Sequence, residues 1–344
     1  MRRRRFLQLS GGAALAALAP FPARALQPFD FARARPLYLD RIAAFRRDGV
    51  LPVLDIESSY NPVDIDLADF TRDMDRAGIA MMCLSADQPG KLVEQGRTWS
   101  DHALEAWETY PAYFIPTGNG GNHPAWTRNE AHFLDDNERF IAEHRYPLMG
   151  EFEFRHYPSP RQVQRGDMFR DVNIPIDGPS GHRLFAFAAR TGIPFQIHYE
   201  IEDELLDPLG RMLAQYPAAR VLWCHLAQIR YAARASRYSP DFLADWLDRY
   251  PNLYIDTAFG GPNSIYPVSG ERHGRFWDRP EAWRDLIVAK PWRFLAALDI
   301  GGDRMTRIEE WTRTLRSVLD TLPPETREIV AYKAGWKFLF GEEW

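Results

Sequence analysis

Three stretches of the sequence decide the fold: TGIPFQIH at residues 191–198, YPAARVLWCHL at 216–226 and YPNLYIDT at 250–257. In each stretch a turn rich in glycine or proline leads into a short apolar run, which predicts a buried strand. The three runs end on His198, His225 and Asp256, whose side chains carry chemistry. Helix-length segments separate the runs, so the pattern predicts parallel strands in one sheet with helices outside it.

The same alternation extends outward through residues 50–344. Eight strands are predicted, at 51–56, 80–84, 113–116, 148–154, 194–198, 220–225, 253–256 and 294–299. Helices are predicted between and after them, at 66–77, 101–110, 129–144, 180–191, 202–215, 241–249, 280–288, 307–321 and 324–339. Eight strand–helix units predict an α/β fold of the (β/α)8 TIM barrel type. Residues 156–178 and 259–279 are expected to be long loops over the active face.

The composition is that of a globular protein. The 344 residues are 45% hydrophobic and 26% charged, and the formal net charge is -5. No basic stripe stands out, so the sequence gives no support to nucleic-acid binding. Two cysteines cannot form a disulfide scaffold. Because Cys83 and Cys224 both lie in apolar strand-like runs, they are expected to be buried free thiols.

The first 25 residues have the pattern of a signal peptide. Four arginines are followed by a mostly apolar stretch and by the A-x-A site of residues 23–25. Arg-Arg-x-Phe-Leu at residues 3–7 resembles a twin-arginine export signal, which implies the twin-arginine export machinery as a partner and a periplasmic or extracellular location. The apolar stretch is too short for a stable membrane span. Residues 26–49 are then a lead-in segment before the barrel.

Polar side chains gather at the predicted strand ends. In a TIM barrel the carboxyl ends of all strands form the active face. Residues i and i+2 of a strand share a face, so Asp55 and Glu57 project together. Glu151, His198, His225 and Asp299 close four further strands. Like charges so close need compensation, and a divalent cation is the simplest one.

These residues and their flanks resemble the amidohydrolase superfamily, specifically its amidohydrolase-related (family 2) branch. The strand stretches quoted above carry the likeness, together with DLADFTRDMDRAGI at 66–79, Asp299, and AGWKFLFG at 334–341. The resemblance covers roughly residues 50–341. It implies a metal-dependent hydrolase acting on a small molecule.

The resemblance also implies roles for individual residues. The metal ligands would be Asp55, Glu57, His198 and Asp299, with Glu151 as a further ligand or a hydrogen-bond partner. The family usually has His-x-His where this chain has Asp55-Ile-Glu57, and hard oxygen ligands favour Mn²⁺ or Mg²⁺ over Zn²⁺.

Catalysis and substrate binding complete the implied site. Asp299 would also accept the proton of the attacking water, and His225 would stabilise the developing oxyanion. The substrate contacts are expected from the loops, at Tyr60, Arg155, Gln228 and Arg230. Glu153, Glu200 and Asp256 are expected to be supporting or capping groups.

Three functions stay open at this stage. The first is an exported hydrolase that cleaves an amide, ester or lactone through a metal-activated water. The second is a decarboxylase of the same branch that acts on an aromatic acid. The third is a barrel that has lost its metal and serves as a binding or accessory protein, because both imidazoles of the first strand are replaced. The sequence leaves the oligomeric state open, a homo-oligomer included.

Overall fold

The computed structural model of the chain describes residues 26–60, 62, 65–86, 101–121, 125–158, 160–166, 168–261 and 275–344. The expected signal peptide of residues 1–25 lies outside the described residues, as does most of the expected loop at 259–279. Among the described helices, none is both long and apolar enough to cross a membrane.

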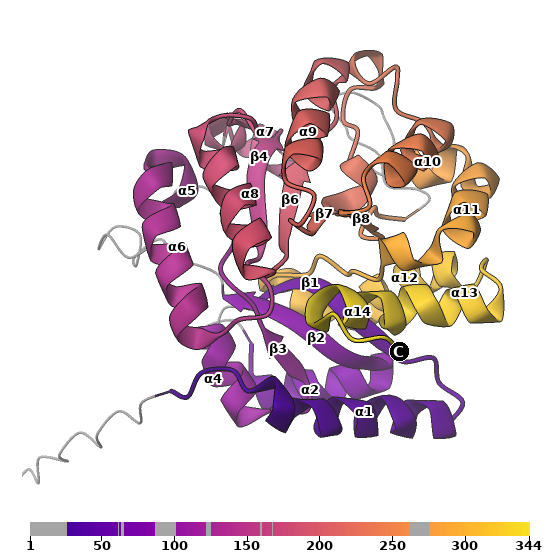
Figure 1. Cartoon of the computed structure of the whole chain (residues 1–344). Coiled ribbons are helices and arrows are strands. Elements are labelled where there is room, and N and C mark those ends of the chain that lie inside the picture. Colours follow the sequence, from indigo (N-terminus) through magenta and orange to yellow (C-terminus); the bar gives the residue numbers. More distant parts are fainter. Residues whose placement is uncertain are drawn as a thin grey trace, which may run out of the picture.

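The strands form two sheets (Figure 1). One holds three strands in the order β1-β2-β3, and the other holds six in the order β5-β4-β6-β7-β8-β9. Every pairing is parallel except the short antiparallel pair of β4 with β5. The strands are β1 Val53–Tyr60, β2 Ile79–Ala86, β3 Phe114–Pro116, β4 Glu151–His156, β5 Val172–Asn173, β6 Phe195–Tyr199, β7 Val221–Trp223, β8 Leu253–Asp256 and β9 Phe294–Leu295.

Main-chain hydrogen bonds join the two sheets at both seams. Between β3 and β4, the Gly121 nitrogen donates to the Glu151 oxygen at 2.7 Å. At the other seam, the Ser59 nitrogen donates to the Ile300 oxygen at 2.8 Å, and the Asp299 nitrogen donates to the Glu57 oxygen at 2.9 Å. These bonds close a ring of eight parallel strands, which confirms the predicted TIM barrel.

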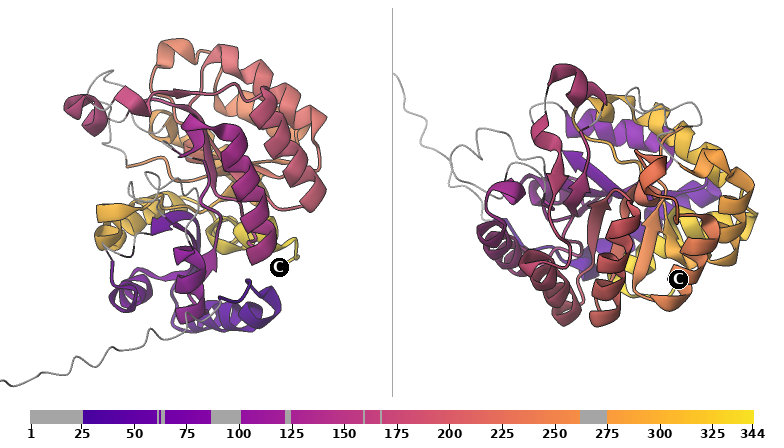
Figure 2. Two further views of the ribbon diagram at one scale, coloured as in Figure 1. Left: turned by 90° about the vertical axis from the view of Figure 1, so that its left-hand side faces the viewer. Right: turned by 90° about the horizontal axis from the view of Figure 1, so that it is seen from above.

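Helices surround this ring (Figure 2). All nine predicted helices are present, and the last consists of α13, a π-helical turn at Ile329–Lys333 and α14. Asp66 caps α2 by accepting hydrogen bonds from the nitrogens of Ala68 and Asp69. The α-helices are α1 Phe31–Arg47, α2 Leu67–Ala77, α4 His102–Thr109, α5 Ala125–Arg128, α6 Glu130–His144, α7 Pro160–Arg165, α8 Pro179–Thr191, α9 Asp203–Gln215, α10 Pro240–Arg249, α11 Pro280–Ala289, α12 Ile308–Leu319, α13 Pro324–Glu328 and α14 Ala334–Phe340.

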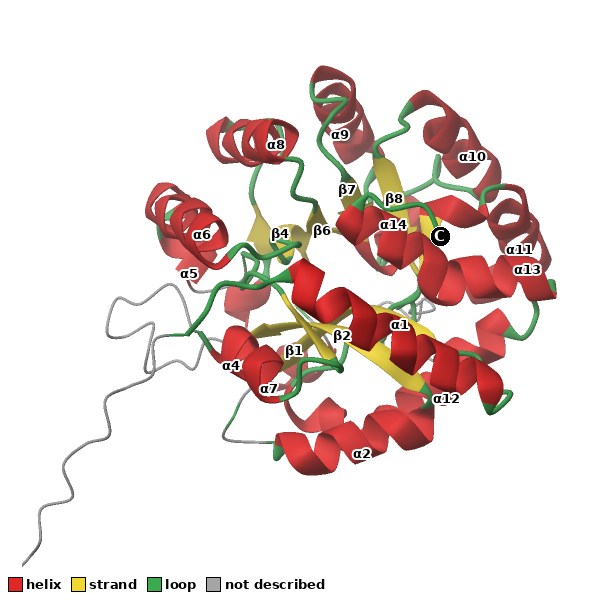
Figure 3. Cartoon of the chain, turned by 60° about the horizontal axis from the view of Figure 1, so that its bottom comes forward, coloured by secondary structure: helices red, strands yellow, loops and turns green. Residues whose placement is uncertain are grey.

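The segment expected as a lead-in forms a helix. Helix α1 crosses the amino-terminal ends of β2 and β3, opposite the expected active face (Figure 3). The Tyr38 hydroxyl donates to the Phe114 oxygen at 2.6 Å, and the Arg41 guanidinium donates to the Ala80 oxygen at 2.8 Å. The lead-in segment therefore caps the floor of the barrel.

The insertion at 156–178 contains structure that the sequence did not predict. It carries α7, a 3-10 turn at Met168–Arg170 and β5, which pairs with the end of β4. Both cysteines are buried and free, as predicted.

Candidate active site

The turn after β7 places His225 in an unusual conformation. Four consecutive residues that are not glycine, 225–228, have positive φ, and His225 itself has φ 60°. The carboxylate of Asp256 supports this turn, because its Oδ1 accepts hydrogen bonds from the nitrogens of His225 (2.8 Å) and Ala258 (2.9 Å). Left-handed backbone costs energy in such residues and is found mainly where function requires it.

Glu151 lies between two imidazoles at the centre of the active face. Its Oε1 is 2.9 Å from Nδ1 of His198 and 3.2 Å from Nε2 of His225. The two rings contact each other with centroids 4.9 Å apart. Strand β4 therefore supplies a carboxylate, and the ends of β6 and β7 supply one imidazole each.

The charges of this cluster depend on one another. Burial by itself would raise the pKa of Glu151, but the two neighbouring imidazoles hold it well below the usual range. Burial by itself would lower the pKa of His198, but Glu151 and Glu200 raise it to about 10. The pKa of His225 is also raised, against its burial, by Glu151, Asp256 and Asp299.

Two further acids lie on the other side of His225. Glu57 Oε1 is 3.9 Å from Nε2 of His225. Among the described residues, Glu57 Oε2, Asp256 Oδ2 and His225 Nδ1 are buried without a hydrogen-bond partner. Burial and the charges of Glu151, Asp256 and Asp299 raise the pKa of Glu57 well above its usual range.

A second carboxylate contacts His198 on its other nitrogen. Nε2 of His198 is 3.3 Å from Oε1 of Glu200. Oε1 of Glu200 also accepts hydrogen bonds from the Arg230 guanidinium (2.8 Å) and from the Tyr157 nitrogen (2.9 Å). The His156 ring lies against His198, with centroids 4.6 Å apart. The sequence analysis did not place Glu200 and His156 next to His198; the i+2 spacing of Glu200 from His198 was the available signal.

Asp55 and Asp299 lie at their expected strand ends, but their oxygens contact other groups of the chain. Asp55 accepts hydrogen bonds from the nitrogen of Leu298 (2.8 Å) and from the hydroxyl of Ser58 (2.5 Å). Burial raises its pKa to about 7 against these hydrogen bonds. Asp299 is partly exposed and forms a two-pronged ion pair with Arg304, at 3.1 and 3.3 Å.

Two of the expected substrate-contact residues are arginines that pair with acids of the chain. Arg155 donates to Glu202 (3.0 Å) and Asp171 (2.7 Å). Arg230 donates to the carboxylate of Glu200 and to the main-chain oxygen of Tyr157. The other two are buried: Tyr60 is the last residue of β1, and Gln228 ends the left-handed turn.

The donor set fits a divalent cation. One ligand atom each of Glu151, His198 and His225 lies within 4.8 Å of the others, and the same holds for Glu57, His225 and Asp256. Buried acceptors without partners beside these atoms need a positive charge nearby. Imidazole and carboxylate together suit Zn²⁺ and Mn²⁺. Glu151, His198 and His225 are the residues that would hold the ion.

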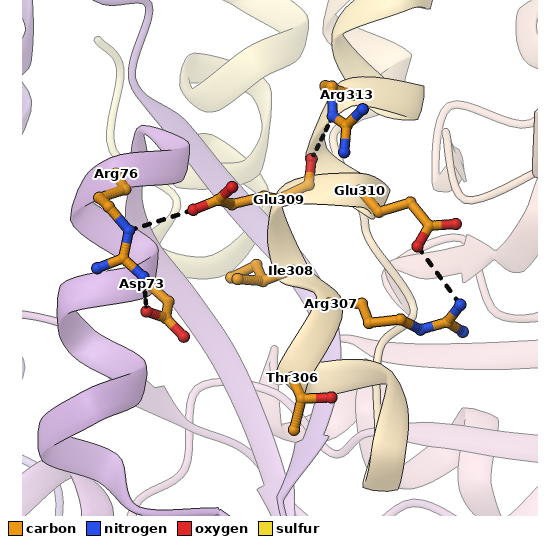
Figure 4. A pocket seen from close by; sticks show the side chains of 8 residues that line it. All are labelled: Asp73, Arg76, Thr306, Arg307, Ile308, Glu309, Glu310 and Arg313. Atoms are coloured by element: carbon orange, nitrogen blue, oxygen red, sulfur yellow. Dashed lines mark hydrogen bonds and ion pairs between the residues drawn. The ribbon is translucent and has the colours of Figure 1, made fainter.

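A separate surface pocket lies outside the ring of strands, between α2 and α12 (Figure 4). Its charged side chains pair with one another: Arg76 contacts Asp73 and Glu309, and Arg307 contacts Glu310. These pairs are solvent-exposed and leave little charge for a ligand.

Comparison with known proteins gives the family. A family model described as amidohydrolase matches residues 92–295, and the chain belongs to this family of enzymes. No curated protein matches the chain in sequence.

Similar solved structures include an amidohydrolase from Burkholderia multivorans with bound zinc, which is 11% identical, with 84% of this chain and 99% of that chain covered and a TM-score of 0.51. Another is a dihydroxybenzoic acid decarboxylase from Polaromonas sp. JS666 with bound manganese and the inhibitor 2-nitroresorcinol. It is 13% identical, with 84% and 96% covered and a TM-score of 0.50. Likeness at this level of identity supports the fold.

Proposed function

We propose that the protein is a divalent-metal-dependent hydrolase that cleaves an amide, ester or lactone bond in an uncharged group. One observation carries the proposal: arginines around the strand ends are each paired with a carboxylate of the chain. The pairs are Arg155–Glu202, Arg170–Glu153, Arg230–Glu200 and Arg304–Asp299. The cluster itself has acids in excess, so it favours a cation and a neutral carbonyl over an anionic substrate.

Different residues are assigned to the proton transfers of hydrolysis. When bound, a divalent ion polarises a carbonyl and lowers the pKa of water. The ion pair with Arg304 holds Asp299 in place at the strand end, and we assign to Asp299 the role of accepting a proton from the attacking water. We assign to Glu57 the donation of a proton to the leaving nitrogen or oxygen, because its burial and the neighbouring acids favour its protonated form. Two neighbouring carboxyl groups in different environments are the usual source of such an acid and base pair.

The alternative function is that of a decarboxylase, and the experiment described below distinguishes it from a hydrolase. An aromatic acid would need a cationic partner for its carboxylate, and these four arginines already have theirs. The full chain, loaded with Mn²⁺, is incubated with p-nitroacetanilide, p-nitrophenyl acetate, γ-butyrolactone and 2,6-dihydroxybenzoate. We expect acid release from at least one of the first three and loss of that activity with a chelator.

Variants make the test specific. Asp299→Asn should lower kcat by about 10²- to 10⁴-fold, the usual contribution of a general base. Glu310→Gln is the matched control, because Glu310 is also paired with an arginine but lies at the outer pocket. Release of CO₂ from 2,6-dihydroxybenzoate without hydrolysis of the amide, ester or lactone would contradict the proposed hydrolase and indicate a lyase.

We also propose that the protein is exported by the twin-arginine route. The support is the arginine pair at residues 3 and 4, the apolar stretch and the A-x-A site. Replacing Arg3 and Arg4 by lysine should leave the precursor in the cytoplasm, whereas Arg24→Lys should not. Fractionation followed by mass measurement of the amino terminus tests this, and export of the double variant at the normal rate would contradict it.

A further inference from the structure

Asn119 is a buried amide without a hydrogen-bond partner among the described residues, and it lies on the segment that runs alongside Glu151. Asn119 is only 6% exposed, and both polar atoms of its side chain, Nδ2 and Oδ1, lack a partner among the described residues. A buried amide that bonds to nothing costs free energy, and next to a candidate active site a ligand can supply the missing hydrogen bonds. The direction of the Asn119 side chain decides whether it can contact a substrate.

Strand geometry turns Asn119 toward the inside of the barrel. β3 ends at Pro116, and the chain continues between the same two neighbours, because the nitrogens of Thr117 and Gly118 donate to the oxygens of Leu84 and Leu148. A Cβ on Gly118 would lie 2.8 Å from Ile141 of α6, so this position faces the outer helices. Successive residues of a strand face opposite sides, which places Asn119 on the inner side.

The seam with β4 fixes Asn119 next to Glu151. The Gly120 nitrogen donates to the Met149 oxygen at 3.1 Å, and the Gly121 nitrogen donates to the Glu151 oxygen at 2.7 Å. Gly120 has φ +64°, and a Cβ there would lie 2.2 Å from the Glu151 oxygen. Only glycine allows this approach, so the position of Asn119 relative to the ion-binding cluster is set by the backbone.

We propose that Asn119 binds the amide group of the substrate and that the substrate is a cis amide: a lactam, a cyclic imide or a primary amide. A carboxamide presents N–H and C=O side by side, and a cis amide presents the complementary C=O and N–H on one edge. The two groups form two parallel hydrogen bonds. An ester or lactone lacks the N–H and leaves Oδ1 of Asn119 without a partner. The inference rests on the proposed hydrolase and narrows its substrate.

Two inert probes test the inference without turnover. 2-Pyrrolidinone is a lactam, and N-methyl-2-pyrrolidinone has the same carbonyl without the N–H. Their dissociation constants are measured on the Mn²⁺-loaded full chain by ligand-observed NMR. We expect wild type to prefer 2-pyrrolidinone by about tenfold, the effect of one hydrogen bond.

Asn119→Ala should bind both probes equally. Asn119→Leu, which is similar in size and has neither a donor nor an acceptor, should do the same and decides the matter if the alanine variant does not fold. Asn137→Ala is the matched control, because Asn137 is 1% exposed with both amide atoms unpartnered, but lies on α6.

Equal binding of the probes to wild type, no binding of either probe, or an unchanged preference in the Asn119 variants overturns the inference. Hydrolysis is assayed separately. Absence of hydrolysis with the lactam preference intact would overturn the proposed function and leave the binding site standing.

Discussion

At the scale of single residues, the carboxylates of the active face fall into two groups. Glu57 and Glu151 direct oxygens toward the imidazoles, whereas Asp55 accepts hydrogen bonds from Leu298 and Ser58. Sequence spacing predicts that Asp55 and Glu57 share a face and cannot separate these roles. The donor to Asp55 comes from a residue 243 positions away along the chain. The left-handed turn at His225 could not be predicted from the sequence either, because none of its residues is glycine.

Asp55→Asn should therefore stabilise the protein at alkaline pH. The folded pKa of Asp55 is about 7, above its ordinary value of 3.8, so its contribution to stability is present below pH 4 and lost as the pH rises through 7. Asparagine keeps the acceptor for Leu298 and carries no charge. The free energy of unfolding of the variant, relative to wild type, should rise by about 3 kcal/mol between pH 4.5 and pH 8.

Urea unfolding at the two pH values is the measurement. Asp55→Ala is the control, because it removes the hydrogen-bond acceptor for the Leu298 nitrogen and should lower the free energy of unfolding at both pH values. Mn²⁺ affinity of Asp55→Asn should stay within about threefold of wild type. A much weaker affinity would mean that Asp55 is an ion ligand after all.

At the scale of elements, a buried ion pair helps to attach the insertion after β4 to the active face. Arg170, on the 3-10 turn, pairs with Glu153 of β4, which is 4% exposed in its side chain. The ring of His156 also contacts the insertion, with Nδ1 2.9 Å from the Arg170 oxygen. The sequence predicted where the insertion begins and ends. It did not predict β5, because a strand of two residues has no periodicity to detect.

Arg170→Ala should destabilise the protein strongly. Arg170→Ala removes the cation of a buried ion pair, at a cost of about 3 kcal/mol. Changing Glu153 to Gln in the same protein should recover more than half of the loss. Arg211→Ala is the control, since the Arg211–Asp177 pair is exposed and should cost less than about 1 kcal/mol. Equal losses in urea unfolding for the two single variants would contradict the account.

At the scale of the whole molecule, the barrel and its strand order were predictable from the sequence, and the register at the two seams was not. Apolar runs and caps locate every strand and helix of the barrel, because burial dictates those residue types. The register at the two seams depends on main-chain contacts such as those of Gly121 and Ile300, which leave no pattern in composition. The convergence of His198, His225, Glu57 and Glu151 followed from the barrel alone, since all parallel strands end on one face.

The ion-binding cluster is the central claim, and calorimetric titration of the chelator-treated full chain with Mn²⁺ tests it most directly. We predict uptake of one ion per chain and an affinity at least about 10²-fold weaker in His198→Ala and in Glu151→Ala, each of which removes a ligand. Glu310→Gln should bind as wild type does. A folded protein that takes up no divalent ion at millimolar concentration would contradict the account and leave a metal-free binding barrel in its place.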